Sequence, residues 1–169
     1  MLLFEKDLPK NTDPLKLFEI FCQMAKAINF YYIYKLFELS DSKIVLYSID
    51  NSSSVDIENC PCGLIYQIDK KDKEINIYIT FIATKYKYRS CGYASLFMNE
   101  FIEFIKRKYL GKFEKIEIIL DSIMSAVTFY EHFGFKWTTT ETKHNSIFNI
   151  DEKNKTFGEH FIMVYDVTA

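Results

Sequence analysis

The feature that most constrains this chain is a strand that passes through a short basic turn into a long amphipathic helix. Residues 74–83 alternate, so we expect one face of a strand to carry Ile75, Ile77, Ile79 and Phe81 and the other to carry Asn76, Tyr78 and Thr80. From Gly92 onward, apolar side chains recur at helical spacing: Tyr93, Leu96, Phe97, Phe101, Phe104 and Ile105. Gly111 lies just past the expected helix end. This order predicts an α/β layered domain.

The flanking sequence predicts further strands and helices of the same kind. Asp13 and Pro14 indicate a helix start, and its inner face is expected to hold Leu15, Phe18, Cys22, Ala25 and Ile28. Another helix is expected at 32–39, and strands at 43–50, 62–68, 116–120, 135–140 and 160–167. Ser122 is expected to cap a helix that ends at Gly134. The 169 residues show no repeat or long linker, so one domain over 1–169 is expected.

Composition argues against several classes of protein. The net charge of −2 does not favour a nucleic-acid binder, and no apolar run is long enough to span a bilayer. The first residues reach acidic side chains almost at once, unlike a signal peptide, so a cytoplasmic or nuclear location is expected, with reduced cysteines. Cys60 and Cys62 lack a second ligand pair at the usual spacing, so no metal is expected.

The turn before the long helix is a candidate phosphate site. A helix start offers unpaired N–H groups and positive dipole charge, and Gly92 and Ala94 leave room for close approach. Lys85, Lys87 and Arg89 add positive charge. A solvated turn explains the same pattern, whereas a dinucleotide fold does not, because G-x-G-x-x-G is absent.

Two blocks, in the right order, resemble a known family. Arg89-Ser90-Cys91-Gly92-Tyr93-Ala94 is similar to the R/Q-x-x-G-x-G/A signature of the GNAT acyl-CoA N-acyltransferase superfamily. Residues 125–135 look like its A-x-x-F-Y-x-x-x-G-F helix and turn, so the resemblance covers 75–137. It implies a three-layer α/β fold with helices on both faces of a mixed, mostly antiparallel sheet. That sheet would have six or seven strands and a central splay that holds CoA.

The resemblance also implies site residues for an N-acetyltransferase of EC 2.3.1 type. Acetyl-CoA would be the co-substrate, with no metal. Backbone groups of Phe81, Ile82 and Ala83 would pair with pantetheine and polarise the thioester. The pyrophosphate would be held by the amides of Arg89, Ser90, Cys91, Gly92, Tyr93, Ala94 and Ser95. Tyr130 matches the family's proton donor to the departing thiolate. Ile123 replaces an Asn that often touches CoA, and Ser122 or Ser125 could substitute for it.

The acceptor amine is less well indicated. The chain resembles the protein N-terminal acetyltransferase branch. In that branch a tyrosine in the register of Tyr78 acts with a histidine on the next strand to deprotonate the amine. Here the next strand, 116–120, contains no histidine, and Glu117 is a poor positional match. Tyr32 is the candidate acceptor contact, although it could simply pack two helices together. The polar segment 141–159 could cover the acceptor.

Three functions stay open at this stage. The first is acetylation of a protein or peptide amine, an N-terminal α-amine rather than lysine. The second is acetylation of a small, polyamine-like amine, and the third is a non-catalytic acyl-CoA-binding module. No nucleic acid or membrane partner is expected, and the protein is expected to be a monomer or homodimer.

Overall fold

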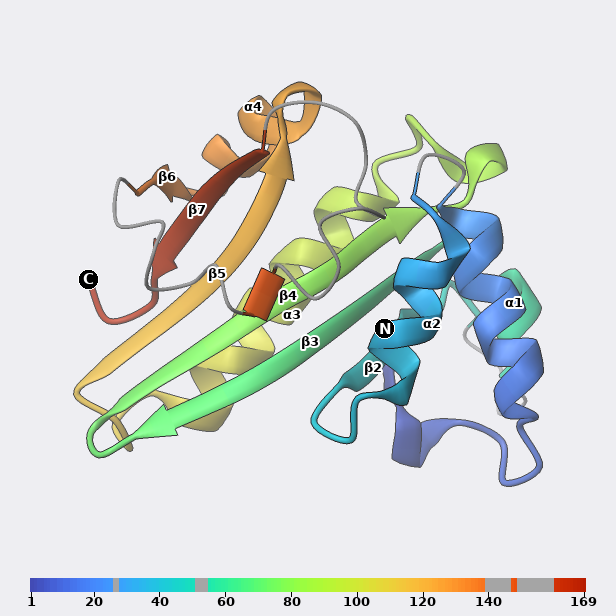
Figure 1. Cartoon of the computed structure of the whole chain (residues 1–169), viewed down its shortest axis with the longest axis horizontal. Helices are drawn as coiled ribbons and strands as arrows, with labels where there is room; N and C mark the ends of the chain where they lie inside the picture. Colours follow the sequence, from blue (N-terminus) through green and yellow to red (C-terminus); the bar gives the residue numbers. More distant parts are fainter. Residues whose placement is uncertain (26–27, 51–54, 139–146, 149–159) are drawn as a thin grey trace.

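The sheet is the organising element of the structure. A computed structural model describes residues 1–25, 28–50, 55–138, 147–148 and 160–169. Its seven strands have the order β1-β2-β3-β4-β5-β7-β6 (Figure 1). Their bounds are β1 Leu2–Phe4, β2 Lys43–Tyr47, β3 Cys62–Lys71, β4 Glu74–Thr84, β5 Lys115–Ile123, β6 Lys136–Trp137 and β7 His160–Asp166. The predicted sheet of six or seven strands is confirmed, although β3 and β5 are longer than expected and β6 is shorter.

The sheet opens between its two central strands. All neighbours pair antiparallel except β4 and β5, which pair parallel from Glu74 opposite Lys115 to Ile79 opposite Leu120. Beyond Ile79, β4 continues to Thr84 without a described pairing to β5. The two strands diverge there in Figure 1. The predicted central splay is therefore present.

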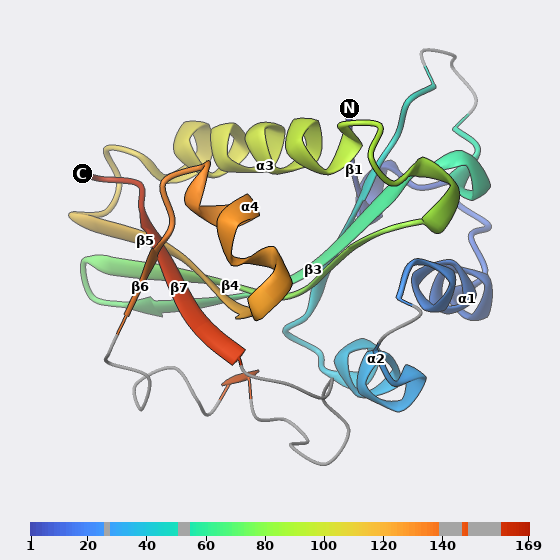
Figure 2. The ribbon, with the colours of Figure 1, turned by 90° about the horizontal axis from the view of Figure 1, so that it is seen from above.

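Helices cover both faces of the sheet, as predicted. Helices α3 (Tyr93–Tyr109) and α4 (Val127–Glu131) lie on one face, and α1 (Pro14–Met24) and α2 (Phe30–Glu38) lie on the other (Figure 2). Four short 3₁₀ segments, at Glu5–Asp7, Ile57–Asn59, Tyr86–Tyr88 and Met124–Ala126, complete the described elements. Within the described part of the chain, no helix has both the length and the apolarity needed to cross a membrane.

Helix α1 begins as predicted but buries a partly different face. The Asp13 side chain accepts a hydrogen bond from the Leu15 N–H at 2.9 Å, and Pro14 occupies the first helical position. Leu15, however, is 61% exposed, and the buried side chains are Leu17, Ile20, Phe21 and Met24. A side chain on Gly63 of β3 would meet Phe21 and Met24 at 2.8–2.9 Å. The close approach of α1 to this glycine selects the buried face, and helical spacing alone could not predict it.

A bulge breaks the predicted alternation of β4. Ile65 of β3 lies opposite Phe81, but the next β3 residue lies opposite Ile79, so Thr80 is the extra residue. The Thr80 hydroxyl donates to the Ile65 carbonyl at 3.2 Å. Phe81 therefore points to the α1–α2 face, where its ring lies 5.4 Å from Phe21, and the prediction that it shares a face with Ile79 was wrong.

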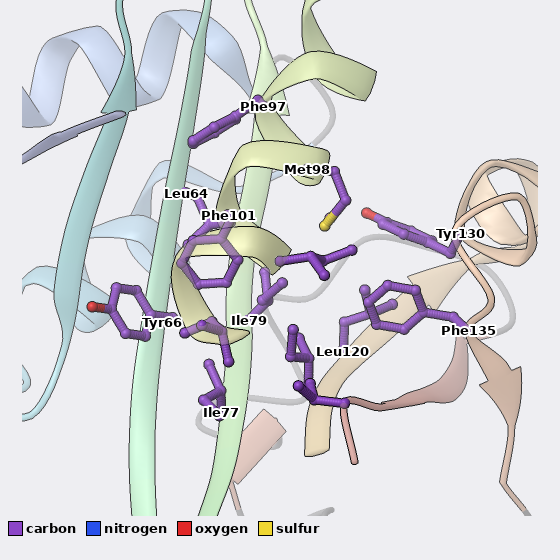
Figure 3. Packing of buried hydrophobic residues seen from close by; sticks show 14 of the residues in the cluster. Leu64, Tyr66, Ile77, Ile79, Phe97, Met98, Phe101, Leu120, Tyr130 and Phe135 are labelled. Atoms are coloured by element: carbon purple, nitrogen blue, oxygen red, sulfur yellow. The ribbon is translucent and has the colours of Figure 1, made fainter. Parts of the chain in front are cut away.

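The larger core lies between the sheet and α3. Phe97, Met98 and Phe101 of α3 pack over the strands beside Tyr130 and Phe135 (Figure 3). Leu96, expected on this inner face, is instead 51% exposed, because the buried stripe of α3 runs through Phe97, Phe101 and Ile105 with Met98, Ile102 and Tyr109. Helix α2 begins two residues earlier than expected, where the Asn29 side chain accepts from the Tyr31 N–H at 2.9 Å.

Candidate active site

A cavity of about 270 Å³ lies in the splay. It is bounded by residues 79–84 of β4 and 120–123 of β5. The remaining lining residues are Met24, Ala25, Ile28, Tyr32, Arg89, Ala126, Tyr130, Phe148 and His160. Phe81, Ile82, Ala83, Arg89, Tyr130 and Tyr32, predicted from separate parts of the sequence, therefore surround one space.

A second cavity, of about 280 Å³, lies at the start of α3. Its lining residues are Thr84, Tyr88, Arg89, Ser90, Gly92, Tyr93 and Ala94. Thr84 and Arg89 line both cavities, so the two adjoin. Together they form a continuous site in which an elongated ligand can place one end at the helix start and the other in the splay.

The backbone of the turn has the geometry of an anion site. Ser90 and Gly92 have φ values of +61° and +80°, in the left-handed region that turns successive N–H groups toward one side. Tyr93 and Ala94 lie in the first turn of α3, which the Ser95 N–H closes by donating to the Gly92 carbonyl at 3.1 Å, so their own N–H groups come before the first intrahelical donor. The dipole of α3 adds positive charge at the same place.

The residues predicted to hold the pyrophosphate fall into two groups, those that line the second cavity and those that do not. Gly92, Ser90, Tyr93 and Ala94 line the second cavity, whereas Cys91 and Ser95 are not among its described lining residues. Cys91 is exposed, and its thiol donates to the Arg89 carbonyl at 3.5 Å. The roles of Cys91 and Ser95 stay predictions.

Only part of the basic turn faces this site. Lys85 is 5% exposed, its ammonium donates to the Glu58 carbonyl, and burial lowers its pKa. It is not among the described lining residues of the second cavity, and its contribution to a phosphate site stays a prediction. The Arg89 Nε donates to the Thr84 carbonyl at 3.3 Å, and its guanidinium lies 5.7 Å from the Tyr86 ring. Because Arg89 lines both cavities, it is the cation best placed for an anionic ligand.

The open edge of β4 is held by Tyr32. Its hydroxyl, from α2, donates to the Thr80 carbonyl at 3.0 Å, at the first residue beyond the β4–β5 pairing. Burial, followed by the charge of Asp121, raises the pKa of Tyr32, so the phenol stays a donor. Residues 81–83 pair with β3 on one side and have no described pairing with β5 on the other, so an extended ligand can lie along this edge.

Tyr130 lies on the opposite wall of the site, in α4. It is 7% exposed and packs against the rings of Phe129 and Phe135 at 5.1 and 5.8 Å. Its ring extends from α4 toward Met98 (Figure 3). Burial alone raises the pKa of Tyr130, so the phenol remains protonated at neutral pH. This is the protonation state that a proton donor needs.

The residues around Ile123 differ from expectation. Ser122 does not cap a helix, because it belongs to β5, which extends to Ile123, and its hydroxyl donates to the Ile123 carbonyl at 2.9 Å. Helix α4 begins after Ala126 without a side-chain cap. Ser122 and Ile123 line the cavity, whereas Ser125 is exposed and is not among the described lining residues. Contact between Ser125 and CoA stays a prediction.

Tyr78 is placed differently from the other candidates. It is 3% exposed, it packs with Ile119 and Ile162, and its ring lies 5.8 Å from that of Phe148. It is not among the described residues that line the cavity. Burial raises its pKa, which disfavours the phenolate that a base would need. A catalytic role for Tyr78 stays a prediction.

Two lining residues were missed by the sequence analysis. The Nδ1 atom of His160 lies 3.3 Å from Oδ2 of Asp121, and both residues line the cavity. The histidine partner of Tyr78 was expected on 116–120, whereas β7 folds back antiparallel and places His160 opposite Ile123. A polar residue at the open end of a buried strand, as Asp121 is, was the available signal.

Cys60 and Cys62 are buried structural thiols. Burial raises the pKa of Cys60 to about 12 and that of Cys62 to about 11. The Cys62 sulfur lies 3.2 Å from the Thr84 hydroxyl. Among the residues that the structure describes, no group of three or more His, Cys, Asp or Glu side chains could hold a metal ion. The segment 141–159 lies outside the described residues except for 147–148.

Solved structures with the same fold are found across the whole chain. Arabidopsis thaliana NAA60 in complex with acetyl-CoA superposes with a TM-score of 0.64 at 13% identity, covering 100% of both chains. Tetrahymena GCN5 gives 0.64 at 13%, covering 98% of this chain and 94% of its own. Arabidopsis thaliana Naa50 in complex with the bisubstrate analogue CoA-Ac-MVNAL gives 0.57 at 17%, covering 97% of both chains. At these identities the likeness shows the fold alone.

The sequence itself identifies the family. No curated protein sequence matches the chain. The family model described as an acetyltransferase (GNAT) domain matches residues 51–151, more than half of the 169 residues. This match includes the splay strands, the turn before α3 and Tyr130. The chain therefore belongs to the GNAT acetyltransferase family.

Proposed function

We propose that the chain transfers an acetyl group from acetyl-CoA, the donor of its family, to the N-terminal α-amine of a protein or peptide. The observation that carries this choice of acceptor is the lining of the splay cavity. Asp121 is the one carboxylate among its described lining residues, and Met24, Ala25, Ile28 and Phe148 form an apolar wall. A single carboxylate suits one ammonium group, and an apolar wall suits the first side chain of a peptide.

The donor fits the adjoining cavities. The pyrophosphate is assigned to the second cavity, against the amides of Ser90 to Ala94 and the guanidinium of Arg89. The pantetheine arm follows the open edge of β4 at residues 81–83, forming hydrogen bonds like those of an added strand. The thioester then lies in the splay between this edge and Tyr130.

The proposed reaction is direct transfer. The amine attacks the thioester carbonyl, and a backbone N–H of residues 81–83 stabilises the developing oxyanion. The C–S bond breaks, its electron pair goes to sulfur, and the Tyr130 hydroxyl gives the thiolate a proton. Holding amine and thioester in one cavity supplies much of the rate gain through positioning.

An α-amine also suits the chemistry better than lysine. Its reference pKa is about 2.5 units lower, so far more of it is neutral and nucleophilic near pH 7. A polyamine is the second candidate acceptor, but it carries several charges and would favour several carboxylates around the cavity. The bisubstrate analogue in the Naa50 structure, CoA-Ac-MVNAL, supports a peptide acceptor by analogy of fold.

The test is a transfer assay followed by mass spectrometry. Three acceptor sets are compared at equal concentration: peptides with a free N-terminus and an apolar first residue, the same peptides with a blocked N-terminus and one lysine, and a polyamine panel. Acetylation of the first set at the α-amine supports the proposal. Preference for blocked lysine peptides or for polyamines refutes the acceptor. Binding of acetyl-CoA without transfer to any amine indicates the non-catalytic module.

Met24 provides a variant that tests the apolar wall. Met24 is fully buried, and it is one of the residues that line the cavity. The Met24→Leu variant preserves volume and polarity to a first approximation, so it should change the preference among apolar first residues more than it changes acetyl-CoA binding. Leu15→Ala, on the exposed face of the same helix, is the control. Equal effects of both variants on every acceptor would contradict the assignment.

A further inference from the structure

We infer that His160 is the general base that deprotonates the acceptor amine, and that Asp121 positions its imidazole. This inference rests on the proposed function and deepens it by naming the base. His160 and Asp121 stand in the cavity on neighbouring strands, β7 and β5.

Strand pairing explains why the two side chains meet. His160 lies opposite Ile123 and Ile162 lies opposite Asp121, so His160 is the diagonal neighbour of Asp121 on the same face of the sheet. The resulting separation is 3.3 Å between Nδ1 and Oδ2. The side chains are 24% and 11% exposed, respectively, so both are largely shielded from solvent.

The carboxylate close to Nδ1 favours one tautomer of His160. A negative charge beside Nδ1 favours the proton on that nitrogen, which leaves the lone pair of the neutral ring on Nε2. The same carboxylate stabilises the imidazolium that forms when Nε2 accepts a proton. A histidine oriented by a carboxylate is a recurrent arrangement for a general base.

The other charged or titratable groups around the cavity do not compete for this role. Among the described lining residues these are Tyr32, Arg89 and Tyr130. Burial raises the pKa of both tyrosines, and the Tyr32 hydroxyl already donates to Thr80. Arg89 carries a positive charge and binds the Thr84 carbonyl. Among the described lining residues, His160 is the side chain whose neutral form carries a basic ring nitrogen.

The step balances as follows. Neutral His160 takes one proton from the ammonium, and the amine lone pair then attacks the thioester carbonyl carbon. When the intermediate collapses, the C–S bond breaks and its electron pair goes to sulfur, which takes the proton of Tyr130. The new amide nitrogen loses its extra proton, which restores Tyr130. His160 releases its proton to solvent, so the products are amide, CoA thiol and one proton.

The experiment is a pH profile of kcat/KM for an α-amine peptide and for hydroxylamine, an acceptor that is already unprotonated near pH 7. In the wild type, the peptide rate should rise through neutral pH. His160→Gln should lower the peptide rate by about 10²- to 10⁴-fold and move the rise toward the pKa of the α-amine itself, about 8, with a much smaller effect on hydroxylamine. Asp121→Asn should lower the peptide rate selectively as well. Acetyl-CoA affinity, measured by calorimetry, should stay within about twofold for both variants and so confirm the fold.

His132→Gln is the matched control, because His132 is exposed at the end of α4. Equal losses with peptide and hydroxylamine, or an unchanged pH profile in His160→Gln, would overturn the assignment. So would a profile that Tyr78→Phe changes and His160→Gln does not. Absence of wild-type transfer to every amine would instead overturn the proposed function, and with it the base.

Discussion

Replacing Tyr32 by Phe tests how the splay is held open. The substitution keeps the ring, which is 7% exposed, and removes the hydroxyl that donates to the Thr80 carbonyl at 3.0 Å. That carbonyl belongs to the bulge residue of β4, beside the last β4–β5 pair. The variant therefore leaves one buried acceptor without its donor while the packing changes little.

The expected fall in the free energy of unfolding follows from the loss of this hydrogen bond. A buried polar group without its partner costs about 1–3 kcal/mol. Thr80 lines the cavity, so we expect water to solvate its carbonyl in part in the variant and the cost to fall in the lower half of that range. For a domain of this size, about 1–2 kcal/mol corresponds to a fall in Tm of roughly 2–8 °C. The free energy of unfolding is measured by urea titration, with an unchanged m-value as the check.

Tyr31→Phe is the control on the same helix, because Tyr31 is 39% exposed. It should change the free energy of unfolding by less than about 0.5 kcal/mol. The Tyr32 variant should also raise the KM for acetyl-CoA, since the donor-binding edge of β4 loses its anchor. Equal stability of both variants, or a lower stability with an unchanged KM, would refute the anchoring role.

Three further outcomes are expected. Tyr130→Phe should lower kcat by about 10²-fold or more with acetyl-CoA affinity nearly unchanged. Because burial raises the pKa of Tyr130, deprotonation of this phenol should not lower wild-type turnover at any pH below about 10, the ordinary pKa of tyrosine. Steady-state kinetics of the wild type and of Tyr130→Phe across pH check both expectations. Gly92→Ala should destabilise the fold by about 1 kcal/mol through its φ of +80°, without a clash, and should weaken acetyl-CoA binding in calorimetry. Cys91, the exposed thiol, should react first with a thiol reagent, and acetyl-CoA should slow that reaction, whereas Cys60 should stay unmodified in the native protein. An equal labelling rate with and without acetyl-CoA would place the pyrophosphate elsewhere.

The residues that line the second cavity could be predicted because their signals are local. A left-handed glycine, a helix start and an arginine lie within a few residues of one another, and they act through backbone geometry that those residues impose. Tyr130 was found in the same way, from a block of adjacent positions. These predictions needed no knowledge of how distant segments meet.

The acceptor half could not be predicted in the same way. Asp121 and His160 are separated by 38 intervening residues, and only the antiparallel return of β7 brings them within 3.3 Å. The inner face of α1 was predicted only in part: Ala25 is buried and Phe18 packs against the core, but Leu15 is exposed. The side chains that approach Gly63 of β3 are Phe21 and Met24, which helical spacing did not single out. Phe81 was assigned to the wrong face because its direction depends on a bulge formed with a different strand.

The sequence by itself determined the sheet-and-helix class, the turn that offers amides to a phosphate and the position of the buried tyrosine. Each depends on periodicity or on backbone preference over a few neighbouring residues. Tertiary structure alone decided where β4 and β5 separate, which tyrosine holds the open edge and which histidine enters the cavity. Those features depend on pairing between strands far apart in the chain, and a one-residue change of register would direct the same side chains to the opposite face.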